Sequence, residues 1–272
     1  MPLIDPARLQ SSLGQYAGRF DVDAIAECDS TSSELLRRAD RGAPAGTVIV
    51  ADRQSAGRGR RGRQWLSAPD DSLTFSFLWR FAGSNGQLAG LSLAVGVAVS
   101  AALEALGVTR VRLKWPNDVL LERSGDFAKL AGILIELGSD RRGTQAVIGI
   151  GINLRAPADD LPQPAAGLID ALPALPERHD LLAALLVALL EVLERFASGG
   201  FTALQSAWQQ RHAWQDQPVR LMHDDVVEGE GICLGADTDG ALLVETAAGI
   251  KRFVSGNVSL RPAGSTLGVR RA

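Results

Sequence analysis

The sequence predicts an α+β protein in which a mixed or antiparallel sheet packed with helices precedes a small antiparallel barrel. Strand-like and helix-like stretches are interspersed up to residue 215. From residue 216 onward, apolar pieces become short and are separated by turn signals such as residues 237–240 and 247–249, a spacing typical of a small barrel. Of the 272 residues, 46% are hydrophobic and 22% charged, a composition that favours a packed core over disorder. We therefore expect two domains, 1–215 and 216–272.

The predicted elements of the first domain follow from apolar periodicity and from capping signals. Thr31 and Glu34 stand in capping-box spacing and predict a helix that ends at Gly42. β-Branched runs or strict alternation predict strands at residues 47–51, 73–79, 111–115, 130–137 and 146–154. Longer apolar stretches predict helices at residues 88–106, 180–197 and 201–212. Residues 155–178 carry several prolines and are expected to form a surface loop.

Composition also limits the class of protein. The net charge is −3, whereas a protein that mainly grips nucleic acid is usually basic, so any basic site must be local. Cys28 and Cys233 lie far apart, the three histidines form no metal-ligand motif, and Asp5 and Arg8 interrupt any secretory start. Small residues and Glu104 favour a buried helix over a membrane span at residues 88–106. The expected compartment is the cytoplasm, without a membrane contact.

The segment GRGRRGRQW at residues 57–65 is the most unusual local feature. Gly57, Gly59 and Gly62 satisfy the G-x-G-x-x-G spacing of dinucleotide-binding folds. That motif requires a helix to begin at the glycines, but here the chain continues as loop and then strand. The dinucleotide interpretation is therefore rejected on context.

Three other interpretations of this segment remain. It can be an Arg/Gly tract for nucleic acid, a solvated basic loop, or an anion-binding loop for a phosphorylated substrate. The third uses glycine backbone N–H groups together with the forked donors of Arg58, Arg60, Arg61 and Arg63. Trp65 then supplies a ring that can stack on a base. Such a loop should be mobile when empty and ordered when an anion binds, like a lid.

Five further blocks occur in order around this segment: DSTS at residues 29–32, KWPND at 114–118, KLAGILIE at 129–136, GIGINL at 149–154 and SLRP at 259–262. Together with 57–65, this set resembles the biotin–protein ligase family over most of residues 27–154, with a weaker match at residues 259–262. The resemblance implies a class II aminoacyl-tRNA synthetase-like (biotin ligase-like) catalytic domain and an SH3-like C-terminal barrel. It also implies a two-step reaction. ATP activates biotin to biotinyl-AMP, and the biotinyl group then passes to a lysine of a biotin carboxyl carrier protein or domain.

The resemblance assigns roles to individual residues. As catalytic residues it implies Lys129, Arg60 and Asp118. As biotin-binding residues it implies Ser30, Thr31, Ser32, Gln54, Gly57, Arg58, Gly59, Arg60, Lys129 and Gly132. As ATP-binding residues it implies Arg60, Arg61, Arg63, Trp65, Asn117, Asp118, Lys129 and Asn153. The family usually has Asn where this chain has Ser32, whereas Lys114 and Trp115 are expected to serve the sheet. Mg²⁺ is expected to arrive with ATP rather than in a protein-built metal site.

Partners and alternatives follow from the same reasoning. About twenty residues precede the catalytic region, too few for a helix-turn-helix reader, so no specific DNA binding and no repressor function are expected. A homodimer is possible, but the sequence decides neither the oligomeric state nor the role of the barrel and its Arg261. Two other functions stay open. One is ligation of lipoate or octanoate on the same scaffold, and the other is a non-catalytic RNA- or protein-binding module.

Overall fold

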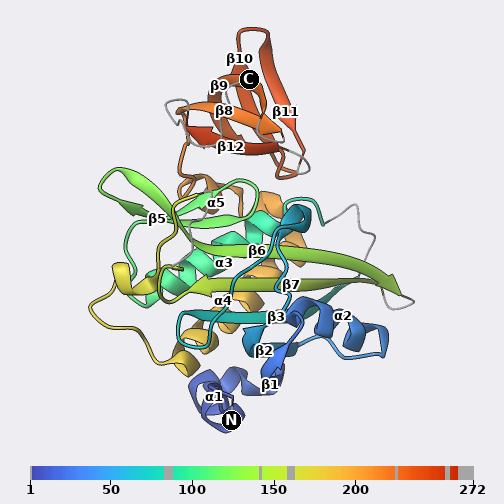
Figure 1. The fold of residues 1–272 in the computed structure, drawn as a ribbon. Coiled ribbons are helices and arrows are strands. Elements are labelled where there is room, and N and C mark those ends of the chain that lie inside the picture. Colours follow the sequence, from blue (N-terminus) through green and yellow to red (C-terminus); the bar gives the residue numbers. More distant parts are fainter. Residues whose placement is uncertain are drawn as a thin grey trace.

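The computed structural model describes residues 2–82, 88–140, 143–157, 163–223, 226–254 and 258–262. Within these residues the strands form one seven-stranded and one five-stranded sheet (Figure 1). The larger sheet contains β1 (Asp21–Cys28), β2 (Thr47–Gln54), β3 (Ser72–Phe81), β4 (Val111–Lys114), β5 (Asp118–Arg123), β6 (Asp126–Asp140) and β7 (Gly143–Asn153). Their spatial order is β1-β2-β3-β7-β6-β5-β4. Only the β1–β2 pair is parallel among them, so the sheet is mixed and mostly antiparallel, as expected.

Helices cover the two faces of this sheet unequally. The long helices α3 (Leu91–Ala105) and α4 (Arg178–Gly199) pack on one face, and α1 (Pro6–Leu13) packs against α4. The shorter α2 (Thr31–Asp40) lies on the opposite face, against β2, β3 and β7 (Figure 1). Because side chains alternate along a strand, each strand gives apolar residues to the α3–α4 core and other residues to the α2 face. In β7 the isoleucines at 148, 150 and 152 enter the core, while Gly149, Gly151 and Asn153 face the other way and line a cavity.

The smaller sheet consists of β8 (Pro218–His223), β9 (Val226–Ala236), β10 (Leu242–Thr246), β11 (Gly249–Phe253) and β12 (Val258–Pro262). It is fully antiparallel in the order β11-β10-β9-β8-β12. The antiparallel architecture predicted for the C-terminal region is confirmed. The predicted barrel is not closed in the described part of the chain, because β11 and β12 remain at opposite edges.

The two sheets are joined by hydrogen bonds at α5 (Gln205–Gln209) and at the end of β4. Gln205 donates to the carbonyl oxygen of Ala236 at 2.7 Å. The buried indole of Trp115 donates from Nε1 to the carbonyl oxygen of Gly240 at 3.1 Å. Trp115 therefore serves the fold, as predicted, by fastening the smaller sheet beside the end of β4.

The predicted capping box at the start of α2 is wrong. The N-cap residue is Ser30, and its side chain makes no capping hydrogen bond. Glu34 accepts instead from the guanidinium groups of Arg37 and Arg38. The hydroxyl of Thr31 bonds to Gln54, so this motif is used for tertiary contacts rather than for capping.

Three other expectations were incomplete. The helix predicted at residues 201–212 is limited to the 3₁₀ turn Phe201–Ala203 and the short α5. The surface loop at 155–178 contains buried Ala166 and Leu168, which lie against the sheet. The strands β1 and β5 and the helix α1 were not predicted. In β1, no residue is fully buried and acidic residues recur, so the apolar signal of a strand is weak.

No helix in the described ranges combines the length and the apolar character that crossing a bilayer requires.

Candidate active site

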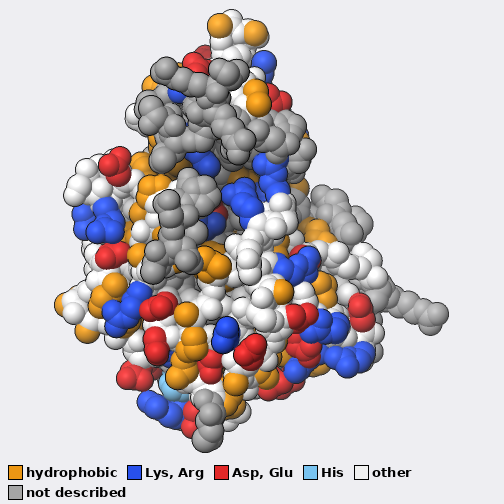
Figure 2. Space-filling view, in the orientation of Figure 1, with side chains coloured by type: hydrophobic (Ala, Val, Ile, Leu, Met, Phe, Trp, Pro, Cys, Tyr) orange, Lys and Arg blue, Asp and Glu red, His pale blue; other side chains and the backbone are white. Residues whose placement is uncertain are grey.

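A cavity of about 460 Å³ opens on the α2 face of the large sheet. Its lining comes from the N-terminus of α2, the loop at residues 58–66, the turn between β4 and β5, and strands β6 and β7. Figure 2 shows Lys and Arg side chains gathered on this face, just below the smaller sheet. All site residues predicted from the sequence line the cavity except Gly57: Ser30, Thr31, Ser32, Gln54, Arg58, Gly59, Arg60, Arg61, Arg63, Trp65, Asn117, Asp118, Lys129, Gly132 and Asn153.

One side of the cavity, which we call the neutral wall, consists of Ser30, Thr31, Ser32 and Gln54. The Thr31 backbone N–H and hydroxyl both donate to Gln54 Oε1, at 2.8 and 3.2 Å. Ser76 on β3 donates to the Thr31 hydroxyl at 2.8 Å and lies 3.1 Å from the Ser32 hydroxyl. All these side chains are buried, so their hydrogen bonds hold the wall in one arrangement without any formal charge.

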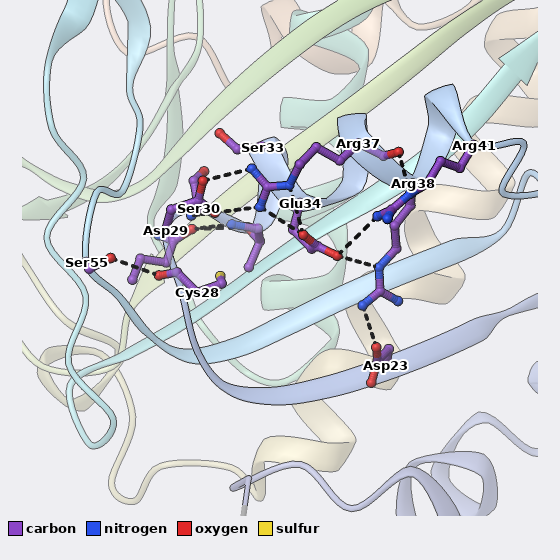
Figure 3. Close-up of polar contacts among 12 residues, drawn as sticks. Asp23, Cys28, Asp29, Ser30, Ser33, Glu34, Arg37, Arg38, Arg41 and Ser55 are labelled. Atoms are coloured by element: carbon purple, nitrogen blue, oxygen red, sulfur yellow. Dashed lines mark hydrogen bonds and ion pairs between the residues drawn. The ribbon is translucent and has the colours of Figure 1, made fainter.

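The neutral wall is supported from behind by ion pairs on the outer side of α2 (Figure 3). Asp29 accepts from the backbone N–H of Ser30 at 2.7 Å and from both terminal nitrogens of Arg37 at 2.9 Å. The hydrogen bonds from Arg37 are the main reason that the pKa of Asp29 falls to about 2. Arg37 and Arg38 share the carboxylate of Glu34. These exposed contacts fix the turn that carries Ser30.

The opposite side of the cavity, which we call the charged wall, consists of Arg60, Lys114, Asp118 and Lys129. Lys129 and Gly132 are three residues apart on β6 and would face opposite sides of a regular strand. The β5–β6 register shifts between Val119 and Leu120, which leaves Leu130 as an extra residue on β6. Such a bulge re-aims the neighbouring side chain. As a result, Lys129 and Gly132 both line the cavity.

The carboxylate of Asp118 lies between two lysines. Its Oδ1 is 2.6 Å from Lys129 Nζ, and its Oδ2 is 3.9 Å from Lys114 Nζ. Burial opposes ionisation of Asp118, but Lys129 and Lys114 outweigh it and hold the pKa of this carboxyl below its usual range. Burial also lowers the pKa of Lys114 to about 7, despite the attraction of Asp118. The charged wall therefore carries more positive than negative charge, as an anionic substrate requires.

Arg60 and Asn117 close the charged wall at the β4–β5 turn. The Arg60 guanidinium donates to Asn117 Oδ1 at 3.2 Å, and Asn117 Nδ2 donates to the carbonyl oxygen of Ile133 at 2.8 Å. Arg58, from the same loop, forms a 2.8 Å ion pair with Glu136 on β6. The loop is thus anchored at one point on β6 and at one point on the β4–β5 turn, and its arginines line the cavity.

Glycines allow this loop to fold tightly against the sheet. A Cβ atom on Gly57 would lie 2.2 Å from the carbonyl oxygen of Trp65, and one on Gly151 would lie 2.2 Å from the Trp65 ring. The indole therefore rests directly on β7. Trp65 Nε1 and Thr74 Oγ1 are buried in the cavity lining with no hydrogen-bond partner within the described ranges. Buried polar atoms are normally satisfied, so both atoms can form a hydrogen bond that the described residues do not supply.

Several lining residues were missed or misread in the sequence, among them Lys114, Thr74 and Arg261. Lys114 was expected to serve the sheet surface, but its side chain is only 7% exposed and lines the cavity. Thr74 and Arg261 also line it, and Arg261 comes from β12 of the smaller sheet. Asn153, predicted to contact nucleotide, donates to the carbonyl oxygens of Lys129 and Ala166. Its amide thereby ties residues 163–168 to β6.

Comparisons with known proteins agree with this architecture. Residues 26–153 match the biotin/lipoate A/B protein ligase family, and residues 216–261 match the biotin protein ligase C-terminal domain. The bifunctional ligase/repressor BirA of Salmonella typhimurium is 39% identical over 266 residues, which are 96% of this chain and 79% of that protein. The biotin–[acetyl-CoA-carboxylase] ligase of Paracoccus denitrificans is 35% identical over 83% of this chain and 94% of its own length.

Solved structures give the same result. The biotin protein ligase of Aquifex aeolicus in complex with biotin and ATP superposes with a TM-score of 0.73 at 32% identity. The match covers 89% of this chain and 99% of the Aquifex chain. The match therefore covers most of the chain. The chain belongs to the biotin protein ligase family.

Proposed function

We propose that this protein activates biotin with ATP to biotinyl-AMP and then transfers the biotinyl group to a lysine of a carrier protein. One observation carries the proposal: a single cavity places the uncharged, hydrogen-bonded neutral wall opposite the lysine-rich charged wall. The neutral wall suits the polar ureido ring of biotin. The charged wall suits the meeting of a carboxylate with a polyphosphate.

In the first step, a carboxylate oxygen of biotin attacks the α-phosphorus of ATP. The bond from that phosphorus to the bridging oxygen breaks, and pyrophosphate leaves with the electron pair. Both reactants are anions, so Lys129 and Arg60 lower the barrier by neutralising charge where it concentrates. Arg61 and Arg63 bind the phosphates that leave, and the Trp65 ring stacks on the adenine.

We propose that Mg²⁺ enters with ATP and is held mainly by phosphate oxygens. Among the residues that the structure describes, no three His, Cys, Asp or Glu side chains are grouped as a metal site would need. The nearest carboxylate, Asp118, is engaged by two lysines. The ion then supplies charge neutralisation to the triphosphate.

In the second step, the neutral ε-amine of the acceptor lysine attacks the carbonyl carbon of biotinyl-AMP. A C–N bond forms, the bond from that carbon to the phosphate oxygen breaks, and AMP leaves. The attacking nitrogen loses one proton, and we assign its acceptance to Asp118, the carboxylate that lines the cavity. The loop at residues 57–65 covers the cavity, which protects the mixed anhydride from water.

The partners of the reaction stay at the level of prediction. We propose that the acceptor is a biotin carboxyl carrier protein or domain and that the reaction takes place in the cytoplasm. Absence of specific DNA binding and a possible homodimer also remain predictions. A gel shift with biotin-operator DNA tests the absence of specific DNA binding, and tight, salt-resistant binding would contradict it. Sedimentation tests the homodimer separately.

The proposed function is tested by ATP–pyrophosphate exchange with biotin, with lipoate, and with neither acid. We expect exchange only with biotin, followed by stable incorporation of labelled biotin into a carrier domain that has its acceptor lysine. A carrier with that lysine replaced by arginine is the matched control. Exchange with lipoate but not with biotin would show that the protein activates lipoate instead. Absence of exchange with any acid would refute ligase activity.

A further inference from the structure

The carboxylate of Asp118 is held by lysines that come from different strands. Lys114 and Asp118 are direct cross-strand partners in the β4–β5 hairpin, so their backbones are fixed relative to each other. Lys129 reaches the same carboxylate from the bulge of β6 and forms the shorter contact, 2.6 Å against 3.9 Å. Lys129 and Asp118 take part in the proposed reaction, whereas no step of it involves Lys114.

Lys129 cannot keep this contact throughout the reaction, if the proposed function holds. Its ammonium must turn toward the biotin carboxylate and the α-phosphate. The side chain has room to do so, since it is 21% exposed. Asp118 is only 12% exposed and would lose its closest cation at that moment. A buried carboxylate without a partner tends to take up a proton and become neutral.

Lys114 is placed to prevent this. Its side chain is 7% exposed and lies 5.8 Å from the centre of the Trp214 ring, which restricts where its ammonium can go. Within the described part of the chain, the charged groups that act on it most strongly are Asp118, Arg261, Lys129 and Arg63. Asp118 is the only anion among these four. Arg60 also acts on Asp118, although its guanidinium is bonded to Asn117.

We propose that Lys114 is a positioning residue that becomes the resident counter-ion of Asp118 when Lys129 turns to the anionic substrate. Lys114 keeps Asp118 ionised and oriented while the adenylate is present. In the transfer step, the proton released by the attacking nitrogen then passes to Asp118, because the carboxylate is still charged. The inference rests on the proposed function and adds a residue that acts through another.

The primary test compares Lys114→Met with Arg112→Met, a matched change on the same strand. Arg112 pairs with Glu122 and does not line the cavity. Transfer from pre-formed biotinyl-AMP to a carrier domain is followed across pH, separately from pyrophosphate exchange. We expect Lys114→Met to slow transfer about 10- to 100-fold. Exchange should fall less, and the acid limb of the transfer profile should move to higher pH because Asp118 protonates more readily.

The Arg112→Met enzyme should keep the wild-type profile, and Lys114→Arg should restore the position of the acid limb. The double variant Lys114→Met/Asp118→Asn should transfer no more slowly than Asp118→Asn alone, because Lys114 acts through that carboxylate. An unshifted acid limb, or losses that multiply in the double variant, would overturn the proposal.

A measurement on the wild-type protein covers the case in which Lys114→Met does not fold. Binding of a non-hydrolysable biotinyl-adenylate analogue is followed by calorimetry at about pH 7.5 in two buffers of different ionisation enthalpy. Lys114 should take up a proton when it becomes the sole partner of Asp118, so we expect net proton uptake. Binding without uptake would overturn the inference alone. No analogue binding and no transfer by the wild-type protein would refute the proposed function instead.

Discussion

The neutral wall and the charged wall of the cavity differ in the kinds of interaction that hold their side chains. In the neutral wall, hydroxyl, amide and backbone groups bond to one another at 2.8–3.2 Å, and Asp29 and Arg37 fix the turn behind them. In the charged wall, one carboxylate is shared by the buried Lys114 and the half-buried Lys129. The first wall is complete as it stands. The second has positive charge left over, which an anionic substrate completes.

This difference indicates that the neutral wall is pre-organised for recognition and that the charged wall changes partners during the reaction. Substitutions in the neutral wall should weaken binding of the acid with little effect on chemistry. Substitutions in the charged wall should affect the chemical steps and their dependence on pH. Substitutions at Lys129, Arg60 and Thr31 and the pH dependence of binding test this contrast.

The largest effect is expected for Lys129→Ala. Removal of one preorganised charge at a reacting centre typically costs about 10²–10³ in rate, and we expect a loss of this size in ATP–pyrophosphate exchange. The KM for biotin should change little, because the neutral wall is intact. Lys251→Ala, on the exposed strand β11, serves as a control that should exchange normally. Exchange within tenfold of wild type would contradict the role of Lys129.

Arg60→Ala should loosen retention of the adenylate. A hydrogen bond to a charged group is worth about 1.5–3 kcal/mol, so release of biotinyl-AMP should accelerate roughly 10- to 100-fold. The escaped anhydride then labels lysines on bystander proteins, which a streptavidin blot detects. If the variant keeps full selectivity for the carrier domain, Arg60 does not retain the intermediate and its assignment to the lid is wrong.

Thr31→Val tests the neutral wall. The substitution removes a hydroxyl that bonds to Gln54 and Ser76 but keeps the shape of the side chain. We expect the KM for biotin in the exchange assay to rise about tenfold with kcat nearly unchanged, since a buried polar group loses its partner. Thr246→Val, the same change on β10 of the smaller sheet and outside the cavity lining, is the control. A fall in kcat larger than the rise in KM would contradict the proposal that the neutral wall serves binding and not the chemical steps.

The smallest effect concerns pH. The pKa of Lys114 is about 7 before binding, and the negative charge of the adenylate raises it in the complex. The protonated form therefore binds better, and affinity should fall as pH rises through 7. The decrease for a biotinyl-adenylate analogue should be roughly fivefold between about pH 7 and pH 8. Calorimetry across this range should give the same slope for Thr31→Val and a flat line for Lys114→Met. A flat wild-type profile would contradict the titration of Lys114.

The strands and helices that depend on a local apolar pattern could be predicted from the sequence. Alternation at residues 73–79 and the isoleucine–glycine alternation at 146–154 correspond to the core and cavity faces of β3 and β7. The N-cap of α2 was misplaced by one residue because Thr31 is used in a tertiary contact with Gln54. Capping residues and binding residues are the same chemical types, so a local motif cannot distinguish them.

Long-range geometry explains what the sequence could not provide. Lys129 was identified through a motif, but its orientation depends on the bulge at Leu130, which arises from pairing with β5. Lys114 was assigned to the sheet because its burial beside Asp118 appears only when β4, β5 and β6 are assembled. Arg261 approaches from another sheet more than a hundred residues later in the chain. Convergence of this kind is a property of the tertiary fold.

A crystal structure with a non-hydrolysable biotinyl-adenylate analogue tests the contrast between the two walls most directly. We expect the Thr31–Gln54 and Ser76–Thr31 hydrogen bonds to be unchanged, with Lys129 Nζ moved from Asp118 to the phosphate and Lys114 as the remaining partner of that carboxylate. If Lys129 still binds Asp118 while the neutral wall rearranges around the ligand, the proposed division between a fixed wall and a wall that changes partners is wrong.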